Sequence, residues 1–467
     1  MYRDPPTVVS AQHTNIGWCL TFVYNKLPGF SAAIVIMSQE ELWKQTKIIG
    51  IIGLGDMGMM YARRFTEAGW KVIGCDREEN YAKLKEEIKD FQIVPNGHYV
   101  SRISDYIIYS VEAEHIDKIV AMYGPSTKLN AIVGGQTSCK YQEIRSFERH
   151  LPSDVEIISV HSLHGPKVNT TGQPLVIIQH RSSDESLQFV NLLMSCLKSK
   201  LVYLTCEEHD KITADTQAVT HAAFLSMGVA WHASNQYPWE VPKWIGGIEN
   251  AKINISLRIY SNKWHVYAGL AITNPSAHAQ ILRYATSCSD LFTLMIQGKD
   301  KELRKRIYTA KQKVFGHLGE KHQLLLDDNI LQQFSLSKEP PEGKQPNSHL
   351  SLLAIVDSWS MLNIVPYDHM ICSTPVFRTF LGVTEYLFCT PNLLDEALDC
   401  AITNTEFRHD DLEFIIAARN WSQIVSNGDF SGYKREFEKT QEFFKPMLPE
   451  ANRLGNEMAK KILERAQ

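Results

Sequence analysis

The chain has 467 residues, of which 44% are hydrophobic and 21% are charged. That length allows two or three domains of roughly 100–200 residues each, and the composition is that of a globular protein with sizeable cores. A formal net charge of −4 offers no field for nucleic acid or an anionic membrane, and the chain has no run of about 18 uncharged apolar residues to span a bilayer. The nine Cys are scattered without a CxxC pair, which disfavours disulfides or structural zinc and favours a reducing cytoplasm.

The first 36 residues do not fit the pattern of the rest. Pro6, Lys26 and Pro28 interrupt their apolar stretches, and no positively charged start precedes a clean apolar run, as a cleaved signal peptide would require. We therefore expect residues 1–36 to be a disordered and dispensable extension, with the working fold beginning near Met37.

From Lys47 the chain alternates short apolar runs with helix-favouring stretches. Residues 47–53 (KIIGIIG) predict a buried strand, residues 56–69 a helix that ends in Gly, and residues 70–75 a second strand. Repeated strand–helix–strand units imply an α/β fold over residues 37–204, a doubly wound parallel sheet with helices on both faces. Further strands are predicted at 106–111, 131–133, 155–160, 175–178 and 201–204.

The loop after the first strand has the sequence GLGDMG, a GxGxxG pattern that opens the first helix. Gly53 permits the tight turn, Gly55 leaves room for a pyrophosphate, Gly58 lets helix and strand approach, and the helix N-terminus offers free N–H groups to phosphates. Asp76 ends the next strand, 23 residues after Gly53, the place of the ribose-binding acid in dinucleotide folds. We therefore predict a Rossmann-type dinucleotide-binding domain. Its cofactor-binding residues are expected to be Gly53, Leu54, Gly55, Asp56, Met57, Gly58, Asp76 and Arg77.

The residues that would choose the cofactor point in two directions. A carboxylate at Asp76 bonds the ribose 2′-hydroxyl of NAD and repels the 2′-phosphate of NADP, whereas Arg77 can grip that phosphate. The residues themselves leave the choice open.

Beyond Thr205 strand-like runs give way to long helix-favouring stretches. We expect an all-α substrate and dimerisation domain over 205–334, a polar Pro-rich loop over 335–348, and a helical C-terminal region over 349–467 that packs on that domain. The apolar helical stretches are too numerous for one small core, which favours a homodimer through this half. Helices are predicted over 207–234, 251–271, 276–313, 349–362, 375–388 and 437–465, the last broken at its internal Pro residues.

Two polar segments follow predicted strands, at the sheet edge where ligands bind in this fold. One is GGQTSCK at 134–140, and the other is VHSLHGP at 160–166. A His at such a strand end, with hydroxyls and a Lys from the neighbouring loop, is a plausible proton-handling site, although loop polar groups could also satisfy one another.

These segments belong to long blocks in which the chain resembles the prephenate dehydrogenases, and most closely the fungal enzymes of tyrosine biosynthesis. The resemblance covers residues 40–460. It is carried by GIIGLGDMG (50–58), IVGGQTSCK (132–140), HSLHGPKVNT (161–170), HDKITADTQAVTHAAFLSMG (209–228), RIYSNKWHVYAGLAITNPSAH (258–278), PNSHLSLLAIVDSW (346–359) and PYDHMICSTP (366–375).

The resemblance implies oxidative decarboxylation of prephenate to 4-hydroxyphenylpyruvate, with hydride transfer to NADP, the cofactor usual for the fungal members. NAD remains possible because of Asp76. The family also implies a dimer formed through the helical half.

The resemblance further implies roles for individual residues. His161 would accept a hydrogen bond from the substrate 4-hydroxyl and take its proton, and Ser138 would bond the same hydroxyl or His161. Lys140 and His221 would lie at the substrate. Ser162 and Leu163 replace the family's usual Pro and Met.

The cation for the two substrate carboxylates is less defined. The position of the family's familiar Arg is Gly269 here, so we expect Arg258, Lys263 or Lys167 to serve instead, with a surface salt bridge as the alternative for Arg258. For His164, His209 and His265 we expect structural roles, with His209-Asp210 bracing a helix start. The spacing of the His residues does not suggest a metal site.

Three other functions remain open at this stage. Arogenate dehydrogenase and 3-hydroxyacid dehydrogenase are sister activities, and the latter would use a Lys such as Lys211 without its usual Gly-x-x-x-Lys-x-x-Asn context. A cofactor-sensing binding protein would keep the fold without the chemistry, but such a protein typically loses its catalytic His.

Overall fold

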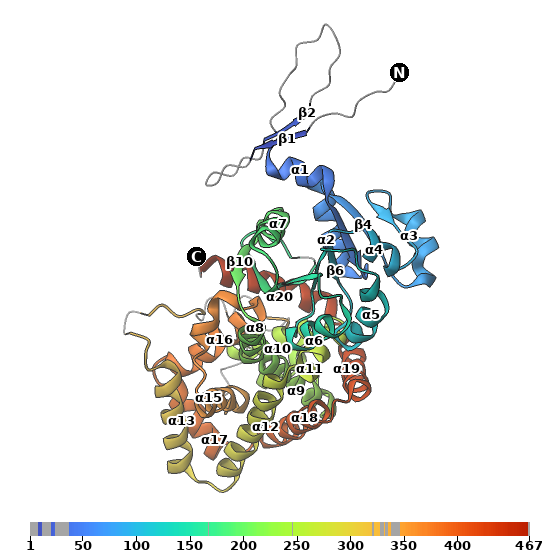
Figure 1. The fold of residues 1–467 in the computed structure, drawn as a ribbon. Helices are drawn as coiled ribbons and strands as arrows, with labels where there is room; N and C mark the ends of the chain where they lie inside the picture. The colour runs from blue at the N-terminus through green and yellow to red at the C-terminus, as the bar shows by residue number, and fades with distance from the viewer. Residues whose placement is uncertain are drawn as a thin grey trace, which may run out of the picture.

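A single eight-stranded sheet, ordered β10-β9-β8-β7-β6-β3-β4-β5, organises the N-terminal half (Figure 1). The computed structural model describes residues 8–11, 20–23, 37–166, 168–244, 246–319, 322–326, 331, 335–337 and 346–465. Strands β3 to β8 pair in parallel, as predicted. The strands are β3 (Ile48–Ile52), β4 (Lys71–Cys75), β5 (Gln92–Ile93), β6 (Tyr106–Tyr109), β7 (Ile132–Gly135), β8 (Glu156–Ser162), β9 (Pro174–Arg181) and β10 (Lys200–Tyr203).

The last two strands depart from the predicted parallel order. β9 pairs antiparallel with β8, and β10 runs parallel to β9, so both strands oppose the rest of the sheet. The connection over residues 163–173 contains no helix, and it is too short for the crossover that a parallel return needs. The chain therefore turns back beside β8, and this turn forms one wall next to His161.

Helices cover both faces of the sheet. Apolar side chains of α1, α2 and α7 form the core on one face, and those of α4, α5 and α6 form the core on the other. This arrangement confirms the α/β, doubly wound architecture. The helices of this half are α1 (Gln39–Thr46), α2 (Asp56–Glu67), α3 (Tyr81–Glu87), α4 (Gly97–Ile103), α5 (Ile116–Tyr123), α6 (Lys140–His150) and α7 (Asp184–Ser195), with short 3₁₀ turns η1 (Glu78–Asn80), η2 (Ala113–His115) and η3 (Gly124–Ser126).

The C-terminal half is helical, as predicted, and begins at Cys206, where Thr205 and Glu208 form a capping box. A π-helical turn, η4 (Ala214–Ala218), interrupts the first long helix, and the chain breaks between α19 and α20 around Pro446. The helices are α8 (Cys206–Thr213), α9 (Val219–Ala233), α10 (Ile248–Tyr260), α11 (His265–Thr273), α12 (Pro275–Ile296), α13 (Asp300–Phe315), α15 (Leu350–Leu362), α16 (Pro375–Cys389), α17 (Leu393–Thr403), α18 (Arg408–Ser426), α19 (Phe430–Phe444) and α20 (Leu448–Arg465), with η5 (Pro238–Glu240), η6 (Pro242–Trp244) and η7 (Pro366–Cys372).

One hydrophobic core runs through the whole helical half, from Ala214 to Met458. Helices α9, α10 and α15 are buried on nearly all sides, because the C-terminal helices pack against them within the same chain. The surplus of apolar helices is thus covered inside one subunit, so it no longer argues for a subunit contact.

The N-terminal extension enters the described part of the chain only at β1 (Val8–Ala11) and β2 (Leu20–Val23). These two strands pair antiparallel in a separate two-stranded sheet, which the sequence pattern did not predict.

Candidate functional site

The glycine loop between β3 and α2 has the geometry of a phosphate-binding turn. Gly53 has φ +98°, and a Cβ there would collide with the carbonyl oxygen of Ser110, while a Cβ on Gly58 would collide with the carbonyl oxygen of Gly53. A Cβ on Gly55 would meet nothing within 4 Å, so the space above the loop is open. Gly55 is also the N-cap of α2 and provides no capping side chain. The first N–H groups of α2 can therefore receive a pyrophosphate, and the loop fits a dinucleotide.

Asp76, at the end of β4, is turned toward the glycine loop. Its Oδ2 accepts a hydrogen bond from the Leu54 N–H at 2.7 Å, and its Oδ1 accepts from the N–H of Arg77 at 2.8 Å and from Asn80 Nδ2 at 2.9 Å. The Arg77 side chain is 77% exposed and has only the loose company of Glu79, 3.6 Å away. The carboxylate therefore braces the loop, while the guanidinium is available to a ligand.

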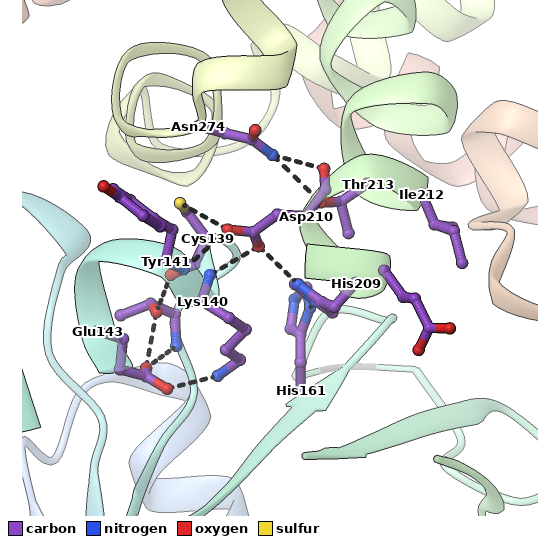
Figure 2. A network of polar contacts seen from close by, with 12 residues as sticks. Cys139, Lys140, Tyr141, Glu143, His161, His209, Asp210, Ile212, Thr213 and Asn274 are labelled. Atoms are coloured by element: carbon purple, nitrogen blue, oxygen red, sulfur yellow. Dashed lines mark hydrogen bonds and ion pairs between the residues drawn. The ribbon is translucent and has the colours of Figure 1, made fainter. Parts of the chain in front are cut away.

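A chain of three side chains lies at the carboxyl end of β8. His161 Nδ1 is 2.7 Å from His209 Nε2, and His209 Nδ1 is 2.8 Å from Asp210 Oδ1 (Figure 2). His161 belongs to β8, whereas His209 and Asp210 come from α8, so the site forms where the two halves meet. An ionised Asp210 can only accept, which fixes the proton of His209 on Nδ1 and leaves its Nε2 to accept from His161. His161 then keeps an unprotonated Nε2, the nitrogen that a base needs.

Burial sets the protonation states of this chain. Burial lowers the pKa of His161 well below its usual range, and the nearby His209 and Lys140 lower it further. Burial also lowers the pKa of His209, against the pull of the Asp210 carboxylate. For Asp210 burial acts in the opposite sense, but hydrogen bonds from His209 and from two backbone N–H groups outweigh it and hold its pKa below the ordinary value. Both imidazoles are therefore neutral at pH 7.

Asp210 also caps a helix of the other half of the molecule. Its oxygens accept from the N–H groups of Lys140 and Tyr141, each at 2.7 Å, at the start of α6, where the N-cap residue Cys139 provides no capping oxygen (Figure 2). The prediction that Asp210 braces a helix start is therefore correct, although the helix is α6 rather than its own. The hydrogen-bonding role of His209 beside His161 was missed. The adjacent His-Asp pair inside a block shared with a dehydrogenase family was the available signal.

Lys140 is not placed where it could face a substrate. Its side chain is fully buried, and Nζ contacts Glu143 Oε1 at 2.8 Å, the Val160 carbonyl oxygen at 2.8 Å, Ser159 Oγ at 2.9 Å and the Gly135 carbonyl oxygen at 3.1 Å. Four acceptors use all three of its protons. The predicted substrate contact is thus replaced by a structural one, in which Lys140 ties α6 to the ends of β7 and β8.

Ser138 lies between β7 and the start of α6 and is half-buried. Within the described part of the chain its hydroxyl makes no hydrogen bond, whereas the neighbouring Thr137 hydroxyl is engaged by Glu143 at 2.6 Å. Gln136, two residues earlier, keeps a buried Nε2 without a partner. This loop therefore presents polar groups that are not satisfied by the protein.

His221 on α9 is a second imidazole with an open nitrogen. Its ring packs edge-on against Tyr267 with 4.6 Å between centroids, its Nδ1 has no partner, and burial lowers its pKa to about 3. Arg258 on α10 donates to the Gly455 carbonyl oxygen at 3.3 Å, and no carboxylate in the described ranges pairs with it. Burial lowers the pKa of Arg258, while the nearby Tyr267 opposes this. The salt-bridge alternative for Arg258 is therefore not realised.

The remaining predicted cations are placed elsewhere. Lys263 pairs with Asp56 at 2.9 Å beside the glycine loop, and Lys167 lies outside the described residues. The Nδ1 atom of His164 lies 3.0 Å from the Gly165 carbonyl oxygen, and His265 faces Glu112 at 3.6 Å.

Two kinds of feature are absent from the described ranges. Three or more His, Cys, Asp or Glu side chains are nowhere grouped there as a metal ion would require. No helix in the same ranges is both long enough and apolar enough to cross a membrane.

Comparison with known proteins identifies relatives of both halves. A family described as a 6-phosphogluconate dehydrogenase C-terminal domain matches residues 218–464, and one described as "NADP oxidoreductase coenzyme F420-dependent" matches residues 48–133. The chain is 66% identical to the prephenate dehydrogenase [NADP(+)] of Saccharomyces cerevisiae over 434 residues, which covers 91% of this chain and 95% of that one.

A second relative is the probable prephenate dehydrogenase [NADP(+)] of Schizosaccharomyces pombe, 57% identical over 428 residues, covering 91% of this chain and 99% of that one. Among solved structures, prephenate dehydrogenase from A. aeolicus in complex with hydroxyphenyl propionate and NAD+ aligns with a TM-score of 0.44 at 17% identity, covering 56% of this chain and 94% of that one.

Proposed function

The chain belongs to the prephenate dehydrogenase family, and we propose on this premise that it converts prephenate to 4-hydroxyphenylpyruvate and CO2 with NADP, in tyrosine biosynthesis. The observation that carries the proposal is the His161–His209–Asp210 chain, which holds an unprotonated imidazole nitrogen at the edge of a dinucleotide-binding sheet. NADP, when bound, accepts the hydride.

The protein's part in the reaction is to remove a proton and to hold the substrate. His161 Nε2 takes the proton of the 4-hydroxyl while hydride leaves carbon 4. The ring carboxylate departs as CO2, and the electron pair of the broken bond enters the ring, which becomes aromatic. His209 accepts the hydrogen bond of His161 Nδ1 and so keeps the ring oriented, with Asp210 stabilising the positive charge that develops.

We assign substrate binding to the polar groups that the protein leaves unsatisfied. Ser138 supplies a free hydroxyl near His161, and His221 supplies an open Nδ1. Arg258, which lacks a carboxylate partner in the described ranges, is a suitable partner for a substrate carboxylate. Lys167 follows His161 closely in the sequence and stays a prediction.

The cofactor assignment turns on Arg77. Asp76 directs its oxygens to backbone N–H groups of Leu54 and Arg77, so its charge is partly neutralised and it does not stand free to repel a 2′-phosphate. Arg77→Gln is expected to raise the KM for NADP by about 10–100-fold, the loss of one charge-assisted phosphate contact, with little change for NAD. Steady-state kinetics with both cofactors measure this. An equal loss for both cofactors would contradict the assignment.

Absorbance at 340 nm, with prephenate and either NADP or NAD, tests the function directly. We expect reduced cofactor to accumulate with prephenate and NADP, and more slowly or not at all with arogenate, which carries an ammonium where prephenate has a keto group. Turnover of arogenate alone would favour the sister activity. Lys211 is exposed, which does not suit the buried Lys of a 3-hydroxyacid dehydrogenase. Cofactor binding without any turnover would favour the sensing alternative.

We also propose a homodimer formed through the helical half, in the cytoplasm. Leu282 on α12 and Leu412 and Ile416 on the neighbouring α18 are exposed apolar side chains that would suit a subunit contact. Light scattering should then give twice the chain mass of 53.1 kDa, and Leu412→Glu/Ile416→Glu should shift the protein to monomer. A monomeric wild-type protein would exclude this arrangement.

A further inference from the structure

An ion pair connects the helical half to the glycine loop. Lys263, in the turn between α10 and α11, places Nζ 2.9 Å from Oδ2 of Asp56, the first residue of α2. The two residues are 207 positions apart in the sequence. Asp56 directly follows Gly55, above which the space is open, so the ammonium lies beside the place where a dinucleotide pyrophosphate meets the helix N-terminus.

The backbone that carries Lys263 is fixed against the dinucleotide-binding half. The first residue of α11, His265, faces Glu112 at 3.6 Å. Farther along α11, a Cβ on Gly269 would lie 2.9 Å from the Cβ of Ala113, so the helix packs closely on the loop that follows β6. The start of α11 therefore spans from the glycine loop to the loop after β6, along the edge where a dinucleotide lies.

The side chain of Lys263, in contrast, is free to change partner. Lys263 and Asp56 are 62% and 67% exposed, and ion pairs with such exposure contribute little to stability. Without Lys263, the Asp56 carboxylate would add a negative charge next to two incoming phosphates. A phosphate oxygen is also a strong acceptor for an ammonium.

We propose that Lys263 binds the pyrophosphate of the dinucleotide across the boundary between the halves, exchanging the Asp56 carboxylate for a phosphate oxygen when the cofactor binds. In the cofactor-free protein Asp56 holds the ammonium at the loop. Cofactor binding thereby draws on both halves of the molecule. This inference rests on the proposed dinucleotide-dependent function.

The test is the affinity for NADPH, measured by quenching of Trp fluorescence, in four proteins. Lys263→Gln should weaken binding by about tenfold or more and should reduce its dependence on salt. Lys263→Arg should restore most of the affinity. Asp56→Asn should bind as well as the wild type or better, and Lys263→Gln/Asp56→Asn should bind better than Lys263→Gln alone.

A fragment of the cofactor provides the matched control. Adenosine 2′-monophosphate keeps the ribose phosphate but lacks the pyrophosphate, so its affinity should be unchanged in Lys263→Gln and reduced in Arg77→Gln. Loss of both ligands in Lys263→Gln would indicate a damaged fold and overturn the proposal, as would unchanged NADPH binding. Equal losses in the two single variants, with no further loss in the double variant, would assign the pair only to holding the halves together. Wild-type protein that binds no NADPH would instead contradict the proposed function.

Discussion

Replacing His161 with Asn is expected to lower kcat with prephenate by about 10²–10⁴-fold, the usual contribution of a positioned general base. The Asn amide can still donate to His209 Nε2, in place of the imidazole Nδ1 that lies 2.7 Å from it. The variant therefore keeps the hydrogen-bonded chain but lacks the nitrogen that removes the proton. Initial rates at saturating prephenate and NADP measure the effect.

His209→Gln is the matched control for this experiment. It retains the base and disturbs only the contact that orients it, so its kcat should fall by less than that of His161→Asn. NADPH affinity should be unchanged in both variants, because neither side chain touches the glycine loop. A His161→Asn protein with near wild-type kcat would remove His161 from the chemistry.

The same imidazole predicts how the rate depends on pH. Because burial lowers the pKa of His161 below its usual range, the base stays unprotonated through pH 6.5, and kcat/KM should fall only in more acidic solution. Circular dichroism at each pH separates this fall from unfolding. A decline centred at the ordinary histidine pKa would mean that His161 is more exposed to water in the working enzyme than in this structure.

Lys140→Met is expected to destabilise the N-terminal half by about 3–5 kcal/mol, because it leaves the Glu143 carboxylate buried without its cation. Both side chains of this pair are 0% exposed, with 2.8 Å between Nζ and Oε1. The midpoint of urea unfolding, followed by a signal from this half, measures the loss. Lys140→Met/Glu143→Gln should recover part of it, since no uncompensated charge remains.

Lys128 offers the control for Lys140, since it pairs with Asp105 at the same 2.8 Å but is 41% exposed. Lys128→Met should cost less than about 1 kcal/mol. Similar losses for the two variants would contradict the structural role of Lys140. A Lys140→Met protein that is stable but has lost its affinity for prephenate would restore the role of a direct substrate ligand.

The sequence by itself determined the features that depend on near neighbours in the chain. Apolar runs bounded by glycine predicted β3 and β4, the motif at Gly53 to Gly58 predicted the phosphate-binding turn, and the position after Val160 placed His161 at a strand end. These predictions hold because strand burial, helix capping and turn geometry are set within a few residues. The resemblance in long blocks identified the family for the same reason.

The tertiary structure decided which distant side chains meet. His209 and Asp210 lie 48 and 70 residues from the partners they contact in His161 and Lys140, and no local pattern states that α8 returns to the end of β8. Lys140 was predicted to bind substrate because its loop faces the site, but the packing of α6 points its ammonium inward to Glu143. The antiparallel return of β9 and the pairing of Lys263 with Asp56 have the same origin. Such contacts arise from the packing of whole elements, and the free energy that selects them comes from burial summed over both halves of the molecule.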